Sequence, residues 1–491
     1  MDVFLIGHAY RYAAEQMLLT LYPEEMPVYP DAPGDADSVR LALSRGRKFV
    51  TASCRLTRGG RTARGRARLS LARLGTGEDA ARLEQRLLKS AFYRAALALG
   101  HEKPVWGCLT GVRPAKFFAG LVVRDGLSPE QARRSLTRDF GVDPDRAALC
   151  ARAFAAAETA RAGLAPEDVC LYIGIPFCPT RCAYCSFVSQ AIGKAGKLMS
   201  PYLDALLQEV RYTGEALRKS GWQARTLYIG GGTPTTLSAE QLRLLMETVQ
   251  SSFDLSRLAE YTIEGGRPDT LSPEKLRLMR ELGCDRISIN PQTMSDAVLQ
   301  AVGRTHTASD VETSFFQARE AGFENINMDL IAGLPGDDPD GFRASLDRVL
   351  ALDPENVTVH TLARKRSSDL FFARTGLPDD EAVGEMVEYS IATLRSAGLS
   401  PYYLYRQKYM SGSFENVGWT KPGYSCLYNI YMMEELHPIL SMGSGGMTKL
   451  TGPEGKLERF HNPKYPKEYA ERTDTVLADK AAFFRRLSAL A

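Results

Sequence analysis

Short runs of β-branched and aromatic residues alternate with amphipathic stretches after Pro166. Such alternation is typical of βα units, in which each helix returns the chain to the same edge of a parallel sheet. The pattern therefore predicts an α/β fold whose central sheet is open or closed into a partial (β/α)6 barrel. We expect strands at Cys170–Ile175, Thr226–Ile229, Tyr261–Glu264, Asp285–Ile289, Ile326–Ile331 and Val357–Thr361. We expect helices near 199–219, 238–252, 273–282, 309–321, 338–352 and 380–397.

The segments on either side of this pattern differ from it. Residues 1–165 are predicted to form an N-terminal α+β domain, residues 166–400 the barrel, and residues 401–491 a smaller, lid-like C-terminal extension with a terminal helix over Thr475–Leu490. Gly59-Gly60 separates two strand-like runs and indicates a hairpin. The other elements expected near the N-terminus are strands at Val3–Ile6, Ser38–Ser44, Lys48–Arg58 and Arg61–Leu71, helices at Tyr10–Leu21 and Asp79–Leu99, and two or three helices within 127–162.

Composition excludes several classes of protein. Of the 491 residues, 44% are apolar and 24% charged, as in an ordinary globular chain rather than a disordered or collagen-like one. No run of about 20 residues is free of charge, so no transmembrane helix is expected. The first residues lack a basic region and a small-residue cleavage site, so we expect a cytoplasmic protein. The net charge of +3 is too small to indicate a nucleic-acid partner, and none is expected.

Three of the nine cysteines, Cys178, Cys182 and Cys185, lie together just after the first strand of the barrel. A cubane of four irons normally takes four thiolates, so three would leave one iron open to another ligand. The alternatives are a zinc site or three unrelated thiols, but structural zinc requires four ligands and no fourth Cys or His is near in sequence. The spacing therefore favours an iron–sulfur cluster. The remaining cysteines are expected to be buried small hydrophobes: Cys54, Cys108, Cys150, Cys170, Cys284 and Cys426.

This Cys-x3-Cys-x-aromatic-Cys loop resembles that of the radical S-adenosylmethionine (SAM) superfamily. With Tyr172, Pro176 and Phe177 before the loop, the segment resembles the oxygen-independent coproporphyrinogen III dehydrogenase family, and more closely its HemZ-type branch. The resemblance covers residues 165 to 450 and extends more weakly to the segment Trp106–Pro114. It implies a [4Fe-4S] cluster on the three cysteines, SAM on the open iron, and a low-potential electron donor such as flavodoxin or ferredoxin.

Further motifs follow the expected strands, where ligands of parallel sheets bind. A glycine run, Gly230-Gly231-Gly232-Thr233, follows the second strand, and glycines let a backbone approach a ligand closely. A carboxylate ends the third strand, and an Arg fork suits the carboxylate of an amino acid. The family positions that bind SAM correspond here to Tyr172, Tyr184, Gly231, Gly232, Thr233, Glu264, Gln292, Arg304, Asp329 and Ala363. His306 and His360 are expected to be structural or to support these groups.

The resemblance implies a reaction and two alternatives to it. Family dehydrogenases remove hydrogen and carbon dioxide from two propionates of coproporphyrinogen III, which gives the vinyl groups of protoporphyrinogen IX. This chain has Gly174 where they have a His, and Phe187 where they have a further Cys. Haem-binding carriers of the same family also lack that Cys, so a haem carrier is one alternative. A radical SAM enzyme that methylates or opens another tetrapyrrole is the second.

Two patches of basic residues bear on the partner. The arginines between Arg61 and Arg68 alternate with other residues, which indicates the solvated face of a strand more than a grip on nucleic acid. Arg364-Lys365-Arg366 follows the sixth strand and could face the propionates of a substrate. Nine aromatic residues from Tyr402 to Tyr431 could stack on a tetrapyrrole, although core packing is expected for most of them. The glycine-rich loop Ser411–Gly423 is expected to cover the site.

Overall fold

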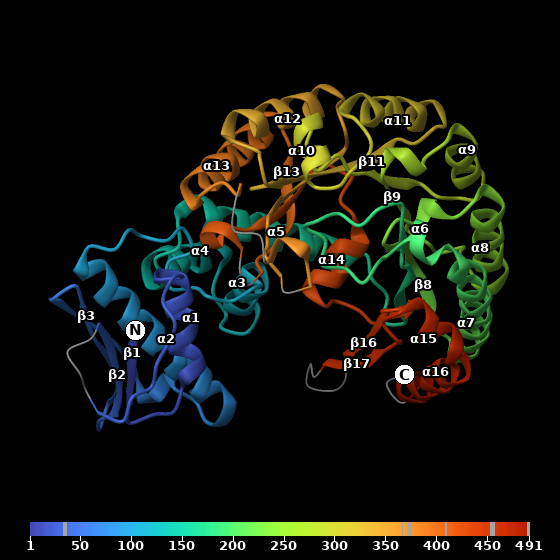
Figure 1. The fold of residues 1–491 in the computed structure, drawn as a ribbon. Helices are drawn as coiled ribbons and strands as arrows, with labels where there is room; N and C mark the ends of the chain where they lie inside the picture. Colours follow the sequence, from blue (N-terminus) through green and yellow to red (C-terminus); the bar gives the residue numbers. More distant parts are fainter. Residues whose placement is uncertain (33–36, 366, 372–375, 408–409, 452–456, 489–491) are drawn as a thin grey trace. The chain divides into compact units, whose positions relative to one another are not determined.

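A computed structural model of the chain describes all residues except 33–36, 366, 372–375, 408–409, 452–456 and 489–491 (Figure 1). Its contacts divide the chain into two compact units, Met1–Ala151 and Arg152–Ala491, and each is described by itself. The division falls inside one helix, α5 (Pro144–Ala162). The domain boundaries at residues 165 and 400 rest on sequence pattern and remain predictions.

The first unit is a four-stranded sheet covered on one face by helices. The strands lie in the order β1 (Asp2–Ile6), β2 (Ser38–Arg45), β3 (Phe49–Arg58) and β4 (Arg61–Ser70), with only β1 and β2 parallel. The expected hairpin at Gly59-Gly60 is present, and both glycines have the positive φ that such a turn requires. The helices are α1 (Arg11–Leu21), α2 (Gly77–Leu99), α3 (Pro114–Val123) and α4 (Pro129–Phe140).

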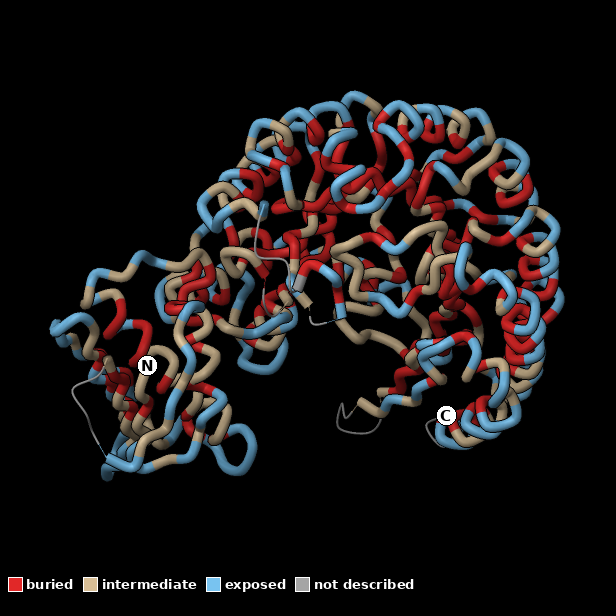
Figure 2. Tube along the Cα trace, viewed as in Figure 1, coloured by how far each residue is buried: buried red, intermediate tan, exposed pale blue. Residues whose placement is uncertain are grey.

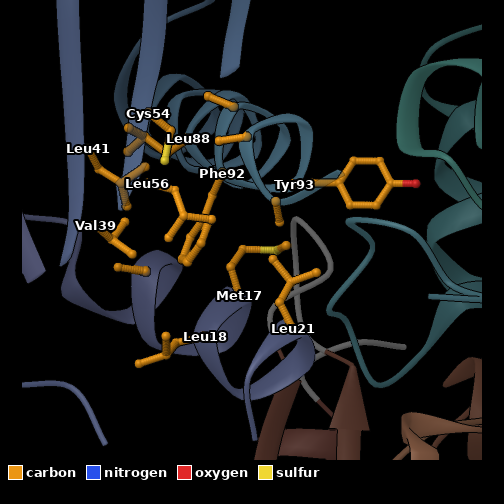
Figure 3. Close-up of a cluster of buried hydrophobic side chains, with 14 of the residues drawn as sticks. Met17, Leu18, Leu21, Val39, Leu41, Cys54, Leu56, Leu88, Phe92 and Tyr93 are labelled. Carbon is orange, nitrogen blue, oxygen red and sulfur yellow. The ribbon is translucent and has the colours of Figure 1, made fainter. Parts of the chain in front are cut away.

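The core of this unit lies between the sheet and helices α1 and α2. Met17 and Leu18 of α1 and Phe92 of α2 pack with strand residues such as Leu41 and Leu56, and all five are buried (Figure 3). Strand β4 turns small residues toward this core and its arginines toward solvent. The expectation of a solvated strand face between Arg61 and Arg68 is thus confirmed. Helix α3 lacks an extended amphipathic pattern, and the sequence analysis does not predict it.

The second unit is built on an eleven-stranded sheet whose centre contains the six predicted strands. Neighbouring strands in this centre are parallel, and the helices that connect them lie along the outer face of the curved sheet (Figure 1). The strands are β5 (Asp168–Ile175), β8 (Gln223–Gly231), β9 (Glu260–Gly266), β10 (Arg286–Ile289), β11 (Asn325–Ala332) and β12 (Asn356–Thr361). The helices are α7 (Met199–Ser220), α8 (Ala239–Ser252), α9 (Pro273–Glu281), α10 (Asp296–Ala301), α11 (Ala308–Glu320), α12 (Pro339–Ala351) and α13 (Asp380–Ser396). Buried residues gather between these two layers (Figure 2).

The residues after 400 extend this sheet at both edges. Strands β13 (Ser400–Tyr405) and β14 (Asn416–Thr420) continue it antiparallel beyond β12. At the other edge β15 (Ile439–Met442) pairs parallel with β5, and β16 (Met447–Thr451) and β17 (Leu457–His461) follow it. The chain ends in α15 (Pro466–Glu471) and α16 (Thr473–Ser488), close to the predicted terminal helix.

Helix α14 (Leu427–Glu434) lies against the inner side of the sheet, where its Tyr428 stacks on Tyr228 of β8 at 4.5 Å between ring centroids. The buried carboxylate of Glu260 in β9 accepts hydrogen bonds from the backbone N–H groups of Leu427 (2.7 Å) and Tyr428 (3.1 Å). A carboxylate there also complements the positive end of the helix dipole. The aromatic C-terminal segment is thus largely core, as expected, while Tyr409 lies outside the described residues.

In the described part of the chain, no helix is both long enough and apolar enough to cross a bilayer.

Candidate active site

A cavity of about 430 Å³ lies at the carboxyl ends of the parallel strands. All of the predicted site residues except Tyr172 line this cavity. Tyr172 lies one layer away, where its ring stacks on Tyr228 at 6.2 Å and on Tyr428 at 6.0 Å. The lining residues predicted from the sequence are Cys178, Cys182, Cys185, Tyr184, Gly231, Gly232, Thr233, Glu264, Gln292, Arg304, Asp329 and Ala363.

The cysteine loop is fixed to the strand ends beside it. Cys178 belongs to the short strand β6 (Phe177–Cys178), which pairs with β7 (Gln190–Ala191), and its sulfur accepts a hydrogen bond of 3.5 Å from Thr233 Oγ1. Thr180 Oγ1 accepts a hydrogen bond of 2.6 Å from Arg267 and donates one of 2.8 Å to the carbonyl of Gly303. These contacts hold the three thiols at one wall of the cavity.

The arrangement of the thiols fits a cluster better than a single ion. Among the residues that the structure describes, no three His, Cys, Asp or Glu side chains are grouped as a single metal ion requires. In a cubane each thiolate binds a different iron, so the sulfurs need not meet at one point. Burial raises the pKa of Cys185 to about 11, so a metal must displace its proton on binding. Three cysteine thiols at one wall of the cavity are donors of the kind that an iron–sulfur cluster requires.

The glycine run brings strand β8 against the start of the cysteine loop. Gly231 has a φ of +112°, a conformation that residues with a side chain rarely adopt. A Cβ on Gly232 would lie 2.6 Å from the carbonyl oxygen of Phe177, closer than real Cβ atoms come. The N–H of Thr233 donates to that same carbonyl at 2.7 Å. The glycines are thus needed to set the loop beside the cavity.

Glu264 at the end of β9 is a carboxyl group held in a low-dielectric site. Its oxygens accept hydrogen bonds from Tyr228 Oη at 2.5 Å and from the N–H of Gly231 at 3.2 Å. Burial outweighs these bonds and raises its pKa to about 7, with a further contribution from the charge of Asp329. The group therefore exchanges a proton close to neutral pH.

Arg304 crosses from the loop after α10 to the cysteine loop. Its Nε donates to Tyr184 Oη at 3.2 Å and its Nη1 to the carbonyl oxygen of Asn290 at 2.6 Å. The side chain is buried, and no carboxylate pairs with it among the described residues. Burial of an unpaired guanidinium is costly, so an anion bound here would be strongly favoured.

Gln292 and Asp329 supply acceptors at the ends of β10 and β11. Gln292 has a φ of +69°, and its Oε1 is buried without a hydrogen-bond partner in the described structure. Asp329 accepts a hydrogen bond of 2.8 Å from Asn327 Nδ2, and its carboxylate lies 3.7 Å from His360 Nε2. Burial raises the pKa of Asp329, but the hydrogen bond and charge of His360 outweigh it and the pKa is lowered. An orphaned acceptor in a cavity is typical of a site that pairs with a ligand.

Several lining residues were not identified from the sequence. Tyr228 precedes the glycine run, and only the alternation of its strand could have indicated that it faces the cavity. Asn416 and Asn429 come from the segment after residue 400, whose pairing with the barrel no motif predicts. Tyr403, which also lines the cavity, belongs to the aromatic run that the sequence offers for stacking on a tetrapyrrole. Lys365, part of the basic run after the sixth strand, lines the cavity, and Arg366 lies outside the described residues. His360 lines it beside Asp329, whereas His306 is buried near Asp269 at 3.7 Å.

Comparison with known proteins identifies the chain's family. Residues 172–349 match the Radical SAM superfamily. Over 389 residues the chain is 40% identical to the oxygen-independent coproporphyrinogen-III oxidase-like protein HemZ of Bacillus subtilis, a match that covers 78% of this chain and 77% of that protein. The chain belongs to the HemZ family of radical SAM proteins. The predicted family, α/β barrel and cofactors, a [4Fe-4S] cluster and SAM, are thereby confirmed.

The chain is also similar to two proteins that are not named HemZ. The heme chaperone HemW of Bacillus subtilis is 39% identical over 237 residues, which cover 47% of this chain and 61% of HemW. The solved structure of coproporphyrinogen III oxidase (HemN) from Escherichia coli, described as a radical SAM enzyme, superposes with a TM-score of 0.53 at 25% identity. That match covers 65% of this chain and 72% of HemN. The chain is thus similar both to a radical SAM enzyme, coproporphyrinogen III oxidase, and to a heme chaperone.

Proposed function

We propose that Cys178, Cys182 and Cys185 hold the [4Fe-4S] cluster, with one iron open to the amino-acid end of SAM. The grouping of the three thiols at one wall of the cavity supports this assignment. When bound, the reduced cluster supplies the electron that cleaves SAM and starts radical chemistry on the substrate. The protein's own residues orient both molecules and exclude water from them. We expect a flavodoxin or ferredoxin to provide the electron.

The polar groups of the cavity suit the different ends of SAM. Arg304, buried and without a carboxylate partner, would bind the carboxylate of the cofactor. Glu264 would accept from an ammonium or hydroxyl group, and its pKa of about 7 makes that contact sensitive to pH. Asp329 and the orphaned Gln292 Oε1 would accept from the nucleoside hydroxyls. Tyr184, Gly231, Gly232, Thr233 and Ala363 would shape the walls, and Tyr172 would support them from the next layer.

The reaction we propose is the oxygen-independent oxidative decarboxylation of coproporphyrinogen III. The observation that carries it is Lys365, which lines the same cavity as the thiols. No carboxylate pairs with its ammonium among the described residues, and burial lowers its pKa. Such a cation is stabilised by an anion that enters the cavity, and a propionate is one. It would hold the substrate's carboxylate close to the cluster.

The balance of this reaction defines what the site must do. Each propionate loses a hydrogen atom from its β-carbon, then carbon dioxide and one further electron, and becomes a vinyl group. Bound SAM would supply the acceptor for the hydrogen atom, and the last electron would pass to an acceptor outside the substrate. Two such rounds give protoporphyrinogen IX. The protein's part is to hold the propionate in place through both steps.

Phe187 favours a second candidate function, that of a haem carrier. Its side chain is 68% exposed and lines the cavity at the position where family dehydrogenases have a Cys. An exposed aromatic ring at a cavity is suited to stack on a flat tetrapyrrole. The similarity to heme chaperone HemW points in the same direction.

An anaerobic assay with the reconstituted full-length protein separates these functions. Reductant, SAM and coproporphyrinogen III are added, and the products are identified by mass. Loss of two carboxyl groups is the expected result. Cleavage of SAM with intact propionates would indicate another substrate, including a tetrapyrrole that is methylated or opened. Stable haem uptake without SAM cleavage would establish the carrier.

The role of Lys365 is tested by a matched pair of substitutions. We expect Lys365→Met to raise KM for coproporphyrinogen III by about tenfold or more, because the variant loses a charge-assisted contact. Lys197→Met removes the same charge from an exposed position outside the cavity and should leave KM within about twofold. Equal KM values in the two variants would contradict a propionate contact at Lys365.

A further inference from the structure

A second cavity, of about 400 Å³, lies wholly within the first unit. One wall is a face of helix α2, and the opposite wall comes from residues 108–111 with Phe117 and Phe140. Residues 108–111 belong to the segment Trp106–Pro114, which the sequence analysis relates to the family but to which the proposed function gives no role. The cavity shares no residue with the barrel site.

Two cations of α2 face this cavity without a carboxylate partner. Arg86 and Lys89 are three residues apart, so they lie on the same side of the helix. Within the described chain neither makes an ion pair. The Arg86 guanidinium lies 4.5 Å from the ring centroid of Phe117, and Lys89 Nζ donates a hydrogen bond of 2.7 Å to the neutral Thr110 Oγ1. Neither cation is therefore neutralised by a carboxylate in direct contact, although the charges of Asp125 and Asp79 attract Arg86 from farther away.

The other charged groups that act on Arg86 are paired with each other. Arg82, which also lines the cavity, is paired with Asp79 at 2.7 Å, and Arg124 is paired with Asp125 at 2.7 Å. Glu78 is the one carboxylate among the described lining residues, and it forms no ion pair with Arg86 or Lys89. The cavity thus has an excess of positive charge.

Keeping these cations partly buried is costly for the folded chain. The pKa of Arg86 is lowered to about 10, chiefly by burial and also by repulsion from Arg82 and Arg124, while attraction by Asp125 and Asp79 opposes the shift. Burial also lowers the pKa of Lys89. Charged groups in partly buried sites are ordinarily paired, because desolvation of an unpaired charge destabilises the native state. A bound anion would provide the missing partner.

We propose that this cavity binds a small organic oxyanion, a carboxylate or a phosphate ester carried on an apolar or flat body. Arg86 and Lys89 contact the oxyanion, and Phe117 and Phe140 pack against the body. Arg86 and Lys89 are neighbouring donors of charge-assisted hydrogen bonds, which suit either oxyanion. The aromatic wall favours a ligand with an apolar or flat body over a bare inorganic ion. The proposal is independent of the chemistry in the barrel.

The test is calorimetric titration of the full-length, cluster-loaded protein under anaerobic conditions. The probes are adenosine monophosphate, a phosphate on a flat body, and coproporphyrin III, a carboxylate on a flat body; inorganic phosphate shows whether the body is needed. We expect one of the two organic anions to bind more tightly than inorganic phosphate. Arg86→Gln and Lys89→Gln should each weaken that binding by about tenfold or more.

Matched variants assign the binding to this cavity. Arg94→Gln removes the same charge from an exposed position of α2 outside the cavity and should change the affinity by less than about twofold. Lys365→Met reports on the barrel cavity, so the proposal is contradicted if every organic anion that binds loses its affinity only in this variant. Binding of neither organic anion at millimolar concentration, or equal losses in Arg86→Gln and Arg94→Gln, would also overturn it. Far-ultraviolet circular dichroism of each variant separates misfolding from loss of a contact.

Discussion

The two cavities of this protein differ in how their charges are balanced. The barrel cavity combines carboxylates, Glu264 and Asp329, with the cations Arg304 and Lys365 and three thiols. The cavity of the first unit has two unpaired cations, Arg86 and Lys89, against one carboxylate, Glu78, among its described residues. A cavity with both positive and negative groups, such as the barrel cavity, suits a zwitterion that must be held in one orientation. A cavity with an excess of positive charge suits an anion. The mixed charges of the barrel cavity are therefore what a zwitterionic cofactor with several contact points requires.

The second unit also contains a buried cation with a carboxylate partner, which can be compared with the unpaired Arg86. Lys480 of α16 lies 3.3 Å from Glu209 of α7, and both side chains are almost fully buried. Lys480 Nζ also donates a hydrogen bond of 3.1 Å to Thr448 Oγ1. Removal of one partner of such a buried pair leaves the other charge uncompensated, whereas removal of an unpaired cation such as Arg86 leaves no such charge behind.

The largest effect is expected from the thiols that distinguish the barrel cavity. Cys182→Ala should abolish the visible absorption of the cluster and all turnover, because the cluster loses one of its three thiolates. Cys54→Ala, in the core of the first unit, should retain both. Iron and sulfide content and SAM cleavage measure the outcome. A fully loaded, active Cys182→Ala protein would remove the basis for placing the cluster at this loop.

The second effect contrasts a paired and an unpaired cation. Lys480→Met should lower the free energy of unfolding by about 3–5 kcal/mol, because Glu209 is left buried without a counter-charge. Arg86→Met removes a charge that has no partner, so its unfolding free energy should stay within about 0.5 kcal/mol of wild type or rise. Chemical denaturation in the absence of added anions measures both. A large loss in Arg86→Met would mean that a fixed partner stabilises this cation after all.

The parts of the fold that the sequence predicts are those with local signals. The six barrel strands and the helices between them, except the short α10, follow from hydrophobic periodicity. Most of the predicted site residues follow from the family resemblance that the short motifs at the strand ends support. The hairpin at Gly59-Gly60 is likewise a local signal. These features depend on neighbouring residues, so no tertiary information is needed to locate them.

The parts that the sequence does not predict depend on long-range pairing. Nothing local indicates that β15 pairs with β5, or that Glu260 holds the start of α14 through a contact 167 residues away. For the same reason Asn416 and Asn429 could not be placed in the cavity beforehand. Lys89 and Arg86 resemble ordinary surface residues of an amphipathic helix until the segment after α2 encloses them.

A third, smaller effect comes from the pKa of Glu264 in the barrel cavity. Since its pKa rises from 4.5 to about 7 on folding, the native state binds a proton that the unfolded chain has released between these values. Stability should therefore fall as pH rises through this window and level off above it, by at most about 3 kcal/mol from this group. Glu264→Gln should remove this slope. An unchanged slope in Glu264→Gln would assign it to other groups.

The smallest effect is expected from Tyr228, whose hydroxyl donates a hydrogen bond of 2.5 Å to Glu264. Because this hydrogen bond favours the ionised carboxyl, Tyr228→Phe should raise the pKa of Glu264 further and move the end of the stability slope to higher pH, by less than about one unit. The cost in unfolding free energy should be about 1 kcal/mol. Tyr405→Phe, which alters another lining tyrosine, should leave the position of the slope unchanged. The same shift in both variants would show that Tyr228 does not control the charge of Glu264, which would then depend on burial and on the charge of Asp329.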